Sequence, residues 1–100
     1  MKYFYSVILF LIGINFYAQP KIPDLTQYAT DLTSTLSDKE TSQISRALKS
    51  FDDTTSTQIV LLIIPSLEGY PIEMLSNEIA EHNKIGTKEH SNGALFLIAM

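Results

Sequence analysis

Cysteine is absent from this chain of 100 residues. The protein therefore cannot form disulfide bonds, and it cannot carry the thioether-linked lipid of a bacterial lipoprotein. Its stability has to come from packing alone, and a domain of this size buries only about 60 to 65% of the surface that its unfolded chain exposes. The sequence therefore predicts a single small domain of marginal stability.

Basic residues are also few. The chain has seven Lys and Arg residues against eleven Asp and Glu residues, and only Lys2 among the basic ones precedes residue 19. The part that follows residue 18 thus carries six basic and eleven acidic residues, a net charge of minus five. Phosphate binding requires clustered Lys and Arg, so this balance excludes nucleic acids and anionic membrane surfaces as partners. The acidic residues are scattered, which favours a solvated surface over a cation-binding one.

Residues 1–18 have the organisation of a secretory signal peptide. Lys2 supplies the positive charge, an apolar run extends from Val7 to Ile12, and Ala18 offers a cleavage site. The apolar run is shorter than the roughly 20 residues that a membrane-spanning helix needs, which favours a cleaved leader over a retained anchor. We therefore expect export, and the composition of the leader is typical of a Gram-negative protein of the periplasm or cell envelope.

Residues 19–27 are predicted to form an extended linker, because Pro20 and Pro23 disfavour helix in the residues before them. The stretch 24–36 has no clear hydrophobic period and is interpreted as an irregular lead-in to the domain. A helix is predicted to begin at Ser37, which forms a capping box with Glu40, and to end over residues 52–56. Its predicted inward face is a stripe of apolar residues at i, i+3, i+4 and i+7: Ile44, Ala47, Leu48 and Phe51.

A β-α-β unit is predicted in the second half of the chain. Thr57–Ile64 contains six consecutive apolar residues without polar alternation, which indicates a strand buried on both faces of a parallel sheet. Pro71 suits the first turn of a helix whose inward face is formed by Leu75 and Ile79. The continuously apolar stretch Ala94–Met100 is predicted to be a second buried strand, parallel to the first.

These elements predict an α/β fold with three layers, α/β/α, in which a mostly parallel central sheet contains a β-α-β core. Met100 falls in or at the end of a predicted buried strand, whereas chain ends usually lie on the surface. Two central parallel strands also need neighbours on either side. We therefore expect the domain to be incomplete at its C-terminus, with the neighbouring strands supplied by further residues or by a partner chain.

Several short pieces of the chain, taken in their order and spacing, resemble the TPM domain family. They are Asp31-Leu32 with Leu36-Ser37, Thr57-Gln58-Ile59-Val60, Pro65 to Glu73, Lys84-Ile85-Gly86 and Ser91 to Ile98. The resemblance covers residues 28–100. It implies an exported bacterial protein, related to thylakoid-lumen proteins that are linked to photosystem II repair and for which acid phosphatase activity has been reported. It also implies that a later membrane helix can tether such a protein.

The chain departs from the pattern of this family at three places. Asn83-Lys84 stand where the family usually has a tryptophan and often a glycine, and Ser56-Thr57 replace a common glycine. A later segment of the family, which has an arginine and a glycine-rich turn, is not among residues 1–100. The resemblance therefore implies that any chemistry supported by that segment is incomplete here.

Asp31 and Asn92 match residues of the family pattern, and they are candidate ligands of a divalent cation. The carboxylate of Asp31 can bind Ca²⁺ or Mg²⁺ or orient a phosphate-bound water, but an aspartate in an irregular segment can equally cap neighbouring amides. Asn92 is followed by Gly93, and this pair either forms a turn or offers an amide oxygen to a metal.

Glu68 is the third candidate ligand. It follows the carboxyl end of the first long strand together with Ser66, and open parallel sheets bind ligands outside those ends. A serine nucleophile needs a base within reach, and the two histidines, His82 and His90, are expected to face solvent. No residue is therefore assigned a catalytic role.

Two functions are compatible with the sequence. The favoured one is an exported accessory or interaction module that binds another envelope or membrane protein, because no acid, base and nucleophile converge. The alternative is an acid phosphatase in which Asp31, Asn92 and Glu68 hold a Ca²⁺ or Mg²⁺ ion that neutralises phosphate charge and activates water. Calcium ligands lie about 2.3 to 2.6 Å from the ion, so the relative positions of Asp31 and Asn92 separate the two functions.

Overall fold

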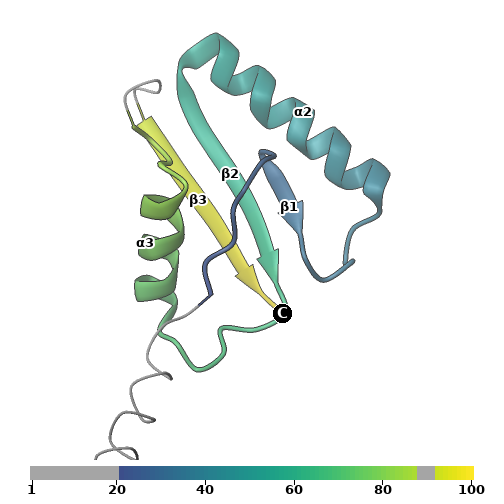
Figure 1. Ribbon diagram of the computed structural model, residues 1–100. Coiled ribbons are helices and arrows are strands. Elements are labelled where there is room, and N and C mark those ends of the chain that lie inside the picture. Colours follow the sequence, from purple (N-terminus) through teal and green to yellow (C-terminus); the bar gives the residue numbers. More distant parts are fainter. Residues whose placement is uncertain (1–20, 88–91) are drawn as a thin grey trace, which may run out of the picture.

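The computed structural model describes residues 21–87 and 92–100, which form an α/β fold (Figure 1). The predicted leader and His90 lie outside these residues. In the described ranges no helix is long and apolar enough to cross a membrane. The elements follow in the order β1 (Ala29–Asp31), α2 (Asp38–Thr55), β2 (Thr57–Ile64), α3 (Ile72–His82) and β3 (Asn92–Ala99).

The three strands form one parallel sheet in the order β1-β2-β3. β2 and β3 pair along their whole length, from Thr57 opposite Asn92 to Ile64 opposite Ala99. β1 has only three residues and pairs with the second half of β2. The predicted β-α-β core and parallel sheet are therefore confirmed, with β2 as the central strand.

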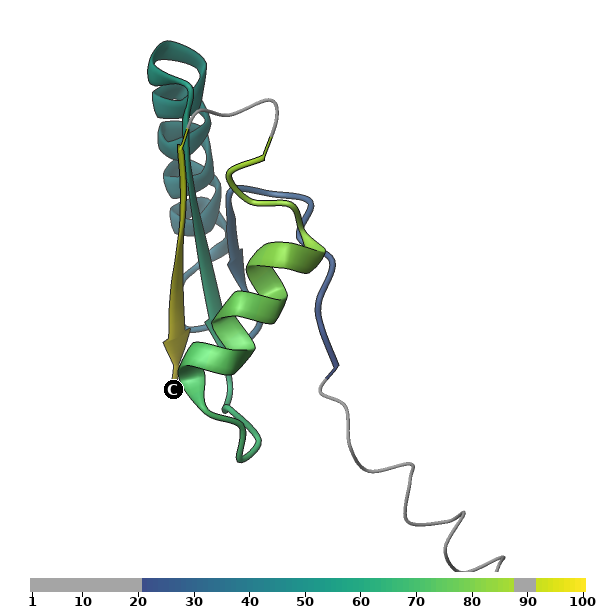
Figure 2. The ribbon, with the colours of Figure 1, turned by 90° about the vertical axis from the view of Figure 1, so that its left-hand side faces the viewer.

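The two helices lie on opposite sides of the sheet (Figure 2). α2 contacts β1 and β2, whereas α3 contacts β3. Successive side chains of a strand point to opposite faces, so β2 alternates between the two layers. Leu62 and Ile64 pack with α3, and Ile63 between them points toward the α2 side. This arrangement gives the three predicted layers.

The apolar core lies between β2 and α3. Leu62 and Ile79 are almost completely buried, with 0% and 1% of their surface exposed, and Leu75 confirms the predicted inward face of α3. Burying a side chain of this size contributes about 1.5–3 kcal/mol. The core cluster consists of Leu62, Ile64, Leu75 and Ile79, and partly buried apolar residues surround it: Ile22, Leu25, Leu67, Tyr70, Leu95 and Leu97.

α2 begins as the sequence predicts. Ser37 Oγ accepts a hydrogen bond from the backbone N–H of Glu40 at 3.1 Å, and the Ser37 N–H donates to Glu40 Oε1 at 3.0 Å. This capping box satisfies two of the amides that a helix start leaves without intrahelical partners. The helix runs to Thr55, so the acidic residues 52 and 53 belong to its last turn.

The buried face of α2 differs from the predicted one. Its buried residues are Ser45 and Asp52, and Phe51 is 43% exposed. The predicted apolar stripe is therefore right only in part: Ile44 and Leu48 are half-buried, whereas Ala47 and Phe51 are exposed. The reason is β1, which forms within the segment predicted to be irregular over 24–36 and whose Ala29 amide takes Ser45 on the helix as its partner.

β3 is less buried than the sequence predicts. Leu95 and Leu97 pack against the core, but Phe96 and Ile98 on the other face are 58% and 45% exposed. α2 covers β1 and β2 and leaves this face of β3 open within the described residues. A run of apolar residues indicates a strand, but it does not reveal which neighbours cover it.

Candidate functional site

The side chain of Asp31 holds the loop between β1 and α2. Its Oδ1 accepts hydrogen bonds from the Thr33 N–H at 2.8 Å and from the Thr33 hydroxyl at 2.5 Å, and its Oδ2 accepts one from the Leu36 N–H at 2.7 Å. These bonds, above all the one from Leu36, hold the pKa of Asp31 below its ordinary value. Both oxygens thus act in the capping arrangement that was one of the two expectations for this residue.

Asn92 lies far from Asp31, although both were expected at one metal site. Asp31 pairs with Ile63 near the carboxyl end of β2, and Asn92 pairs with Thr57 at its amino end. Thr57 and Ile63 are six positions apart, and a strand rises about 3.3 Å per residue, so roughly 20 Å of sheet separates the two side-chain positions. Ligands of one ion lie within about 2.6 Å of it, so this arrangement does not let Asp31 and Asn92 share a cation.

Asn92 and Gly93 also do not form the turn that was their other expected role. They are the first two residues of β3 and pair with Thr57 and Gln58. Positive φ, which that turn would need, is found nearby at Lys84 and at Gly86. The described positive φ values before β3 therefore lie earlier in the chain than the expected turn.

Glu68 does lie at the carboxyl end of the sheet, in the loop after β2. The Tyr70 N–H donates to the Leu67 carbonyl at 3.0 Å, and the two residues between them, Glu68 and Gly69, have φ values of 51° and 83°. Two central residues with positive φ define a type I′ turn. Ser66 Oγ accepts a hydrogen bond from the Glu68 N–H at 3.2 Å, so this hydroxyl supports the turn.

An apolar cleft of about 290 Å³ opens beside this turn, and we call it the carboxyl-end cleft. Among the described residues, the charged ones that line it are Lys21 and Glu68. Its apolar lining includes Leu32, Leu67, Tyr70, Leu75 and Ile79. The cleft therefore occupies the position where parallel sheets bind ligands, but its chemistry suits apolar side chains better than a phosphate group.

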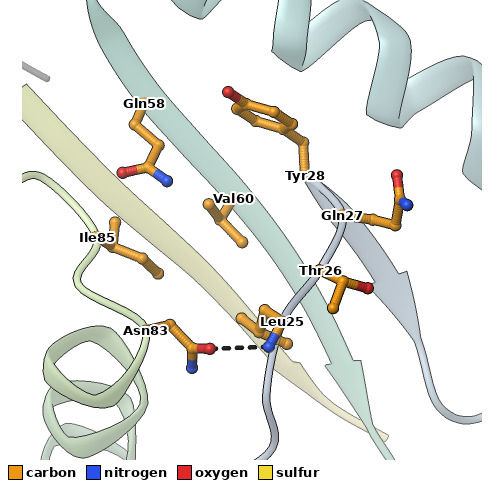
Figure 3. Close-up of a pocket in the computed structure, with 8 residues that line it drawn as sticks. All are labelled: Leu25, Thr26, Gln27, Tyr28, Gln58, Val60, Asn83 and Ile85. Atoms are coloured by element: carbon orange, nitrogen blue, oxygen red, sulfur yellow. Dashed lines mark hydrogen bonds between the residues drawn. The ribbon is translucent and has the colours of Figure 1, made fainter. Parts of the chain in front are cut away.

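A smaller cavity of about 130 Å³ lies between β2, the end of α3 and the segment that precedes β1 (Figure 3). Gln58 and Asn83 line it from opposite sides, and each already serves a backbone group: Gln58 Oε1 accepts from the Gly86 N–H at 2.9 Å, and Asn83 Oδ1 accepts from the Leu25 N–H at 2.8 Å. Neither a carboxylate nor a histidine is among the described residues that line this cavity.

The buried polar residues of α2 hold β1 in place. Ser45 Oγ accepts hydrogen bonds from the N–H groups of Tyr28 and Ala29 at 3.1 and 3.3 Å, and the Tyr28 hydroxyl donates to Asp52 Oδ2 at 2.6 Å. The hydrogen bond to Asp52 is the main reason that the pKa of Tyr28 is raised to about 12. At neutral pH the Tyr28 hydroxyl therefore stays protonated and acts as a fixed donor.

His82 is paired with Asp24, and its Nε2 lies 2.6 Å from Asp24 Oδ1. The His82 side chain is 47% exposed and thus faces solvent, as the sequence predicts. Among residues 21–87 and 92–100, no three His, Cys, Asp or Glu side chains gather closely enough to hold a metal ion. The candidate ligands are thus distributed over the sheet, and an acid, a base and a nucleophile are not brought together in the described part.

A family model described as the TPM domain matches residues 29–100, from the first residue of β1 onward. No protein with a curated description matches the chain. The match includes all three strands and both helices.

Proposed function

The chain belongs to the TPM domain family, and from that premise we propose that it is an exported accessory module that binds another protein of the cell envelope or membrane. The carboxyl-end cleft is the observation that carries this proposal. It is apolar, only two of the described residues that line it are charged, and it opens at the end of the sheet where ligands bind in this class of fold.

A second observation supports binding of a protein rather than of a small polar substrate. Leu32 lines the cleft and is 55% exposed, and Met100, directly after β3 at the same end of the sheet, is 64% exposed. Exposed apolar groups at this end extend the surface that a protein partner can contact. Phe96 and Ile98 are also exposed, but on the other face of β3. Export rests on the leader-like residues 1–18, which supply the route to the periplasm or cell envelope.

The alternative is a metal-assisted acid phosphatase, which rests on the family resemblance. Its supposed ligands do not favour it, because Asp31 and Asn92 lie at opposite ends of the sheet and Asp31 uses both oxygens in hydrogen bonds. Glu68 and Asp31 lie toward the same end of the sheet, but among the described residues no group of three His, Cys, Asp or Glu side chains gathers there to hold a cation. The interaction module is therefore the function that the geometry supports better.

Photo-crosslinking in intact Gram-negative cells tests the proposal. A crosslinking residue replaces Tyr70 in the carboxyl-end cleft, and a matched control replaces Ser50 on the exposed side of α2. We expect one crosslinked envelope protein from position 70 and none from position 50, and Leu67→Glu should abolish the product. A folded, exported protein that gives the same products from both positions would contradict the proposal.

A further inference from the structure

Residues 21–27 form an extended strap that crosses the α3 side of the sheet. The strap runs from beside α3 toward β1 without forming a helix or strand (Figures 1 and 2). Its two aliphatic side chains, Ile22 and Leu25, pack against the core cluster. The strap is therefore part of the wall of the core, although it precedes the first strand of the domain.

The side chain of Asn83, the C-cap residue of α3, binds the backbone of the strap. Asn83 Oδ1 accepts a hydrogen bond from the Leu25 N–H at 2.8 Å, and Asn83 Nδ2 donates to the Pro23 carbonyl at 3.0 Å. The same Nδ2 donates to the Ile79 carbonyl at 2.9 Å, which fixes the amide to the helix. The Asn83 amide thus pairs with one backbone N–H and one backbone carbonyl of the strap, as the backbone of a neighbouring strand would.

The remaining attachment of the strap is weak. His82 and Asp24 form an ion pair only when the histidine is protonated, and their side chains are 47% and 87% exposed. Exposed pairs contribute little because water screens them. Retention of the strap therefore depends mainly on two apolar side chains and on the amide of Asn83.

The strap also separates the two cavities. Lys21 and Pro23 line the carboxyl-end cleft, and the following residues, from Leu25, line the smaller cavity. We expect removal of the strap to leave one groove along β2 and α3, with Ile64, Leu75 and Ile79 of the core cluster lining the part at the carboxyl-end cleft. In the structure, this groove is filled by an extended segment in which two aliphatic residues are three positions apart.

We propose that the strap is a displaceable occupant of a peptide-binding groove, and that the groove accepts in its place an extended segment of the partner protein with the same chemistry. That segment has two aliphatic side chains three positions apart, which take the places of Ile22 and Leu25, and its backbone pairs with the amide of Asn83. This inference rests on the proposed interaction function and adds the class of partner segment and the means by which access is controlled.

Tethering predicts that a separate segment binds the wild-type protein only weakly. A covalently attached segment has an effective concentration on the order of millimolar, so a peptide in solution competes poorly with the strap. Substitutions that weaken the packing of the strap, but leave Asn83 in place, should therefore allow a separate peptide to bind the groove.

A labelled peptide with the sequence of residues 19–27 provides the probe. In fluorescence anisotropy, the full chain that carries Ile22→Ser and Leu25→Ser should bind this peptide at least about tenfold more tightly than the wild-type chain. A peptide with the same two serine substitutions is the matched control and should not bind. Adding Asn83→Ala to the strap variant should weaken binding by about tenfold. Equal binding by wild type and folded strap variant, or binding indifferent to Asn83→Ala, would overturn the proposal.

Hydrogen exchange of the wild-type protein keeps the proposal testable if the strap variant does not fold. A displaceable strap predicts that the Leu25 amide exchanges about a hundredfold or more faster than the amide of Leu62 in the core strand. Equal protection of the two amides would show that the strap opens only with the whole domain, and would overturn the proposal.

The outcomes also distinguish this inference from the proposed function. One outcome is that position 70 of the strap variant crosslinks a specific envelope partner that the peptide of residues 19–27 does not displace. This result would support the interaction function but reject the peptide-binding groove. Loss of the specific crosslink, with peptide binding intact, would instead reject the partner and retain a groove that recognises its own strap.

Discussion

Gly93 lies directly against the backbone of Gly86. A Cβ atom placed on Gly93 would stand 2.5 Å from the Gly86 Cα and 2.6 Å from its nitrogen, distances that real Cβ contacts do not reach. The Gly86 N–H meanwhile donates to Gln58 Oε1 on β2. The two glycines therefore bring the segment after α3 into direct contact with the start of β3. A side chain at position 93 would collide with this backbone.

Gly93→Ala is expected to destabilise the domain by about 1–3 kcal/mol, since the added methyl group has to push backbone atoms apart. Gly69→Ala is expected to lose stability for a different reason, because a side chain at a φ of 83° is strained although no heavy atom lies within 4 Å of a built Cβ. Urea unfolding of both variants measures the two costs. A cost for Gly93→Ala below about 1 kcal/mol would contradict the close contact.

Glu68→Asn is expected to stabilise the domain by about 0.5–1 kcal/mol. Glu68 has a φ of 51° in a type I′ turn, a conformation that asparagine adopts more readily than glutamate. Thermal unfolding measures the gain, and Glu68→Val should instead lower the midpoint. A loss of stability with Glu68→Asn that appears only when Ca²⁺ or Mg²⁺ is present would indicate a ligand role for the carboxylate.

Asp31→Ala is expected to lower the midpoint of thermal unfolding in metal-free buffer, because the loop amides lose their acceptors. The pKa of Asp31 is lowered in the folded protein from the ordinary value of 3.8. Its contribution to stability is therefore present above pH 3.8 and is lost as the pH falls through the lower, folded pKa. The gap in midpoint between wild type and Asp31→Ala should thus be full at pH 7 and shrink below about pH 3.8. A gap seen only with added metal would refute the capping role.

Titration with Ca²⁺ or Mg²⁺ is expected to give no rise in midpoint that depends on both Asp31 and Asn92. A ligand that binds only the folded state raises its stability by mass action, so a shared site would show a rise that Asp31→Ala and Asn92→Ala each abolish. The separation of these residues along the sheet argues against that result. Observing it would restore the phosphatase alternative and justify assays with a phosphate ester.

Tyr28→Phe is expected to cost about 1–2 kcal/mol, since it removes a donor to the buried Asp52. The pKa of Tyr28 is raised from 10.0 to about 12, so the neutral form is favoured in the folded state. The stability that this hydroxyl contributes is therefore present below pH 10 and is lost as the pH rises toward 12. Unfolding of wild type and variant between pH 8 and 11 measures this loss, and a constant difference across that range would contradict it.

Local signals in the sequence were sufficient for some elements. The Ser37–Glu40 capping box, the apolar run of β2 and the Leu75/Ile79 face of α3 each depend on neighbours within one element, and each is confirmed. β1 was missed because a strand of three residues has no measurable period. Its absence from the prediction led in turn to a buried face for α2 that is right only in part.

The candidate site was harder to predict, because it depends on which end of the sheet each residue occupies. Asn92 begins its strand and Glu68 follows one, so parallel strands place them at opposite ends, but Asp31 had no strand to which it could be assigned. The resemblance to the family gave one signal here, because it implies a tryptophan and often a glycine where Asn83-Lys84 stand. The bonds of Asn83 to the strap span almost sixty positions and could not be read from local spacing.

The outer edge of β3 has a consequence for the solubility of the protein. From Asn92 to Ala99 this edge has neither a charge nor a proline, and no other described strand pairs with it. Such edges recruit strands of other molecules and seed aggregation unless they are covered. The yield of soluble protein should therefore fall steeply with expression level, and a chaperone that shields this edge should restore it.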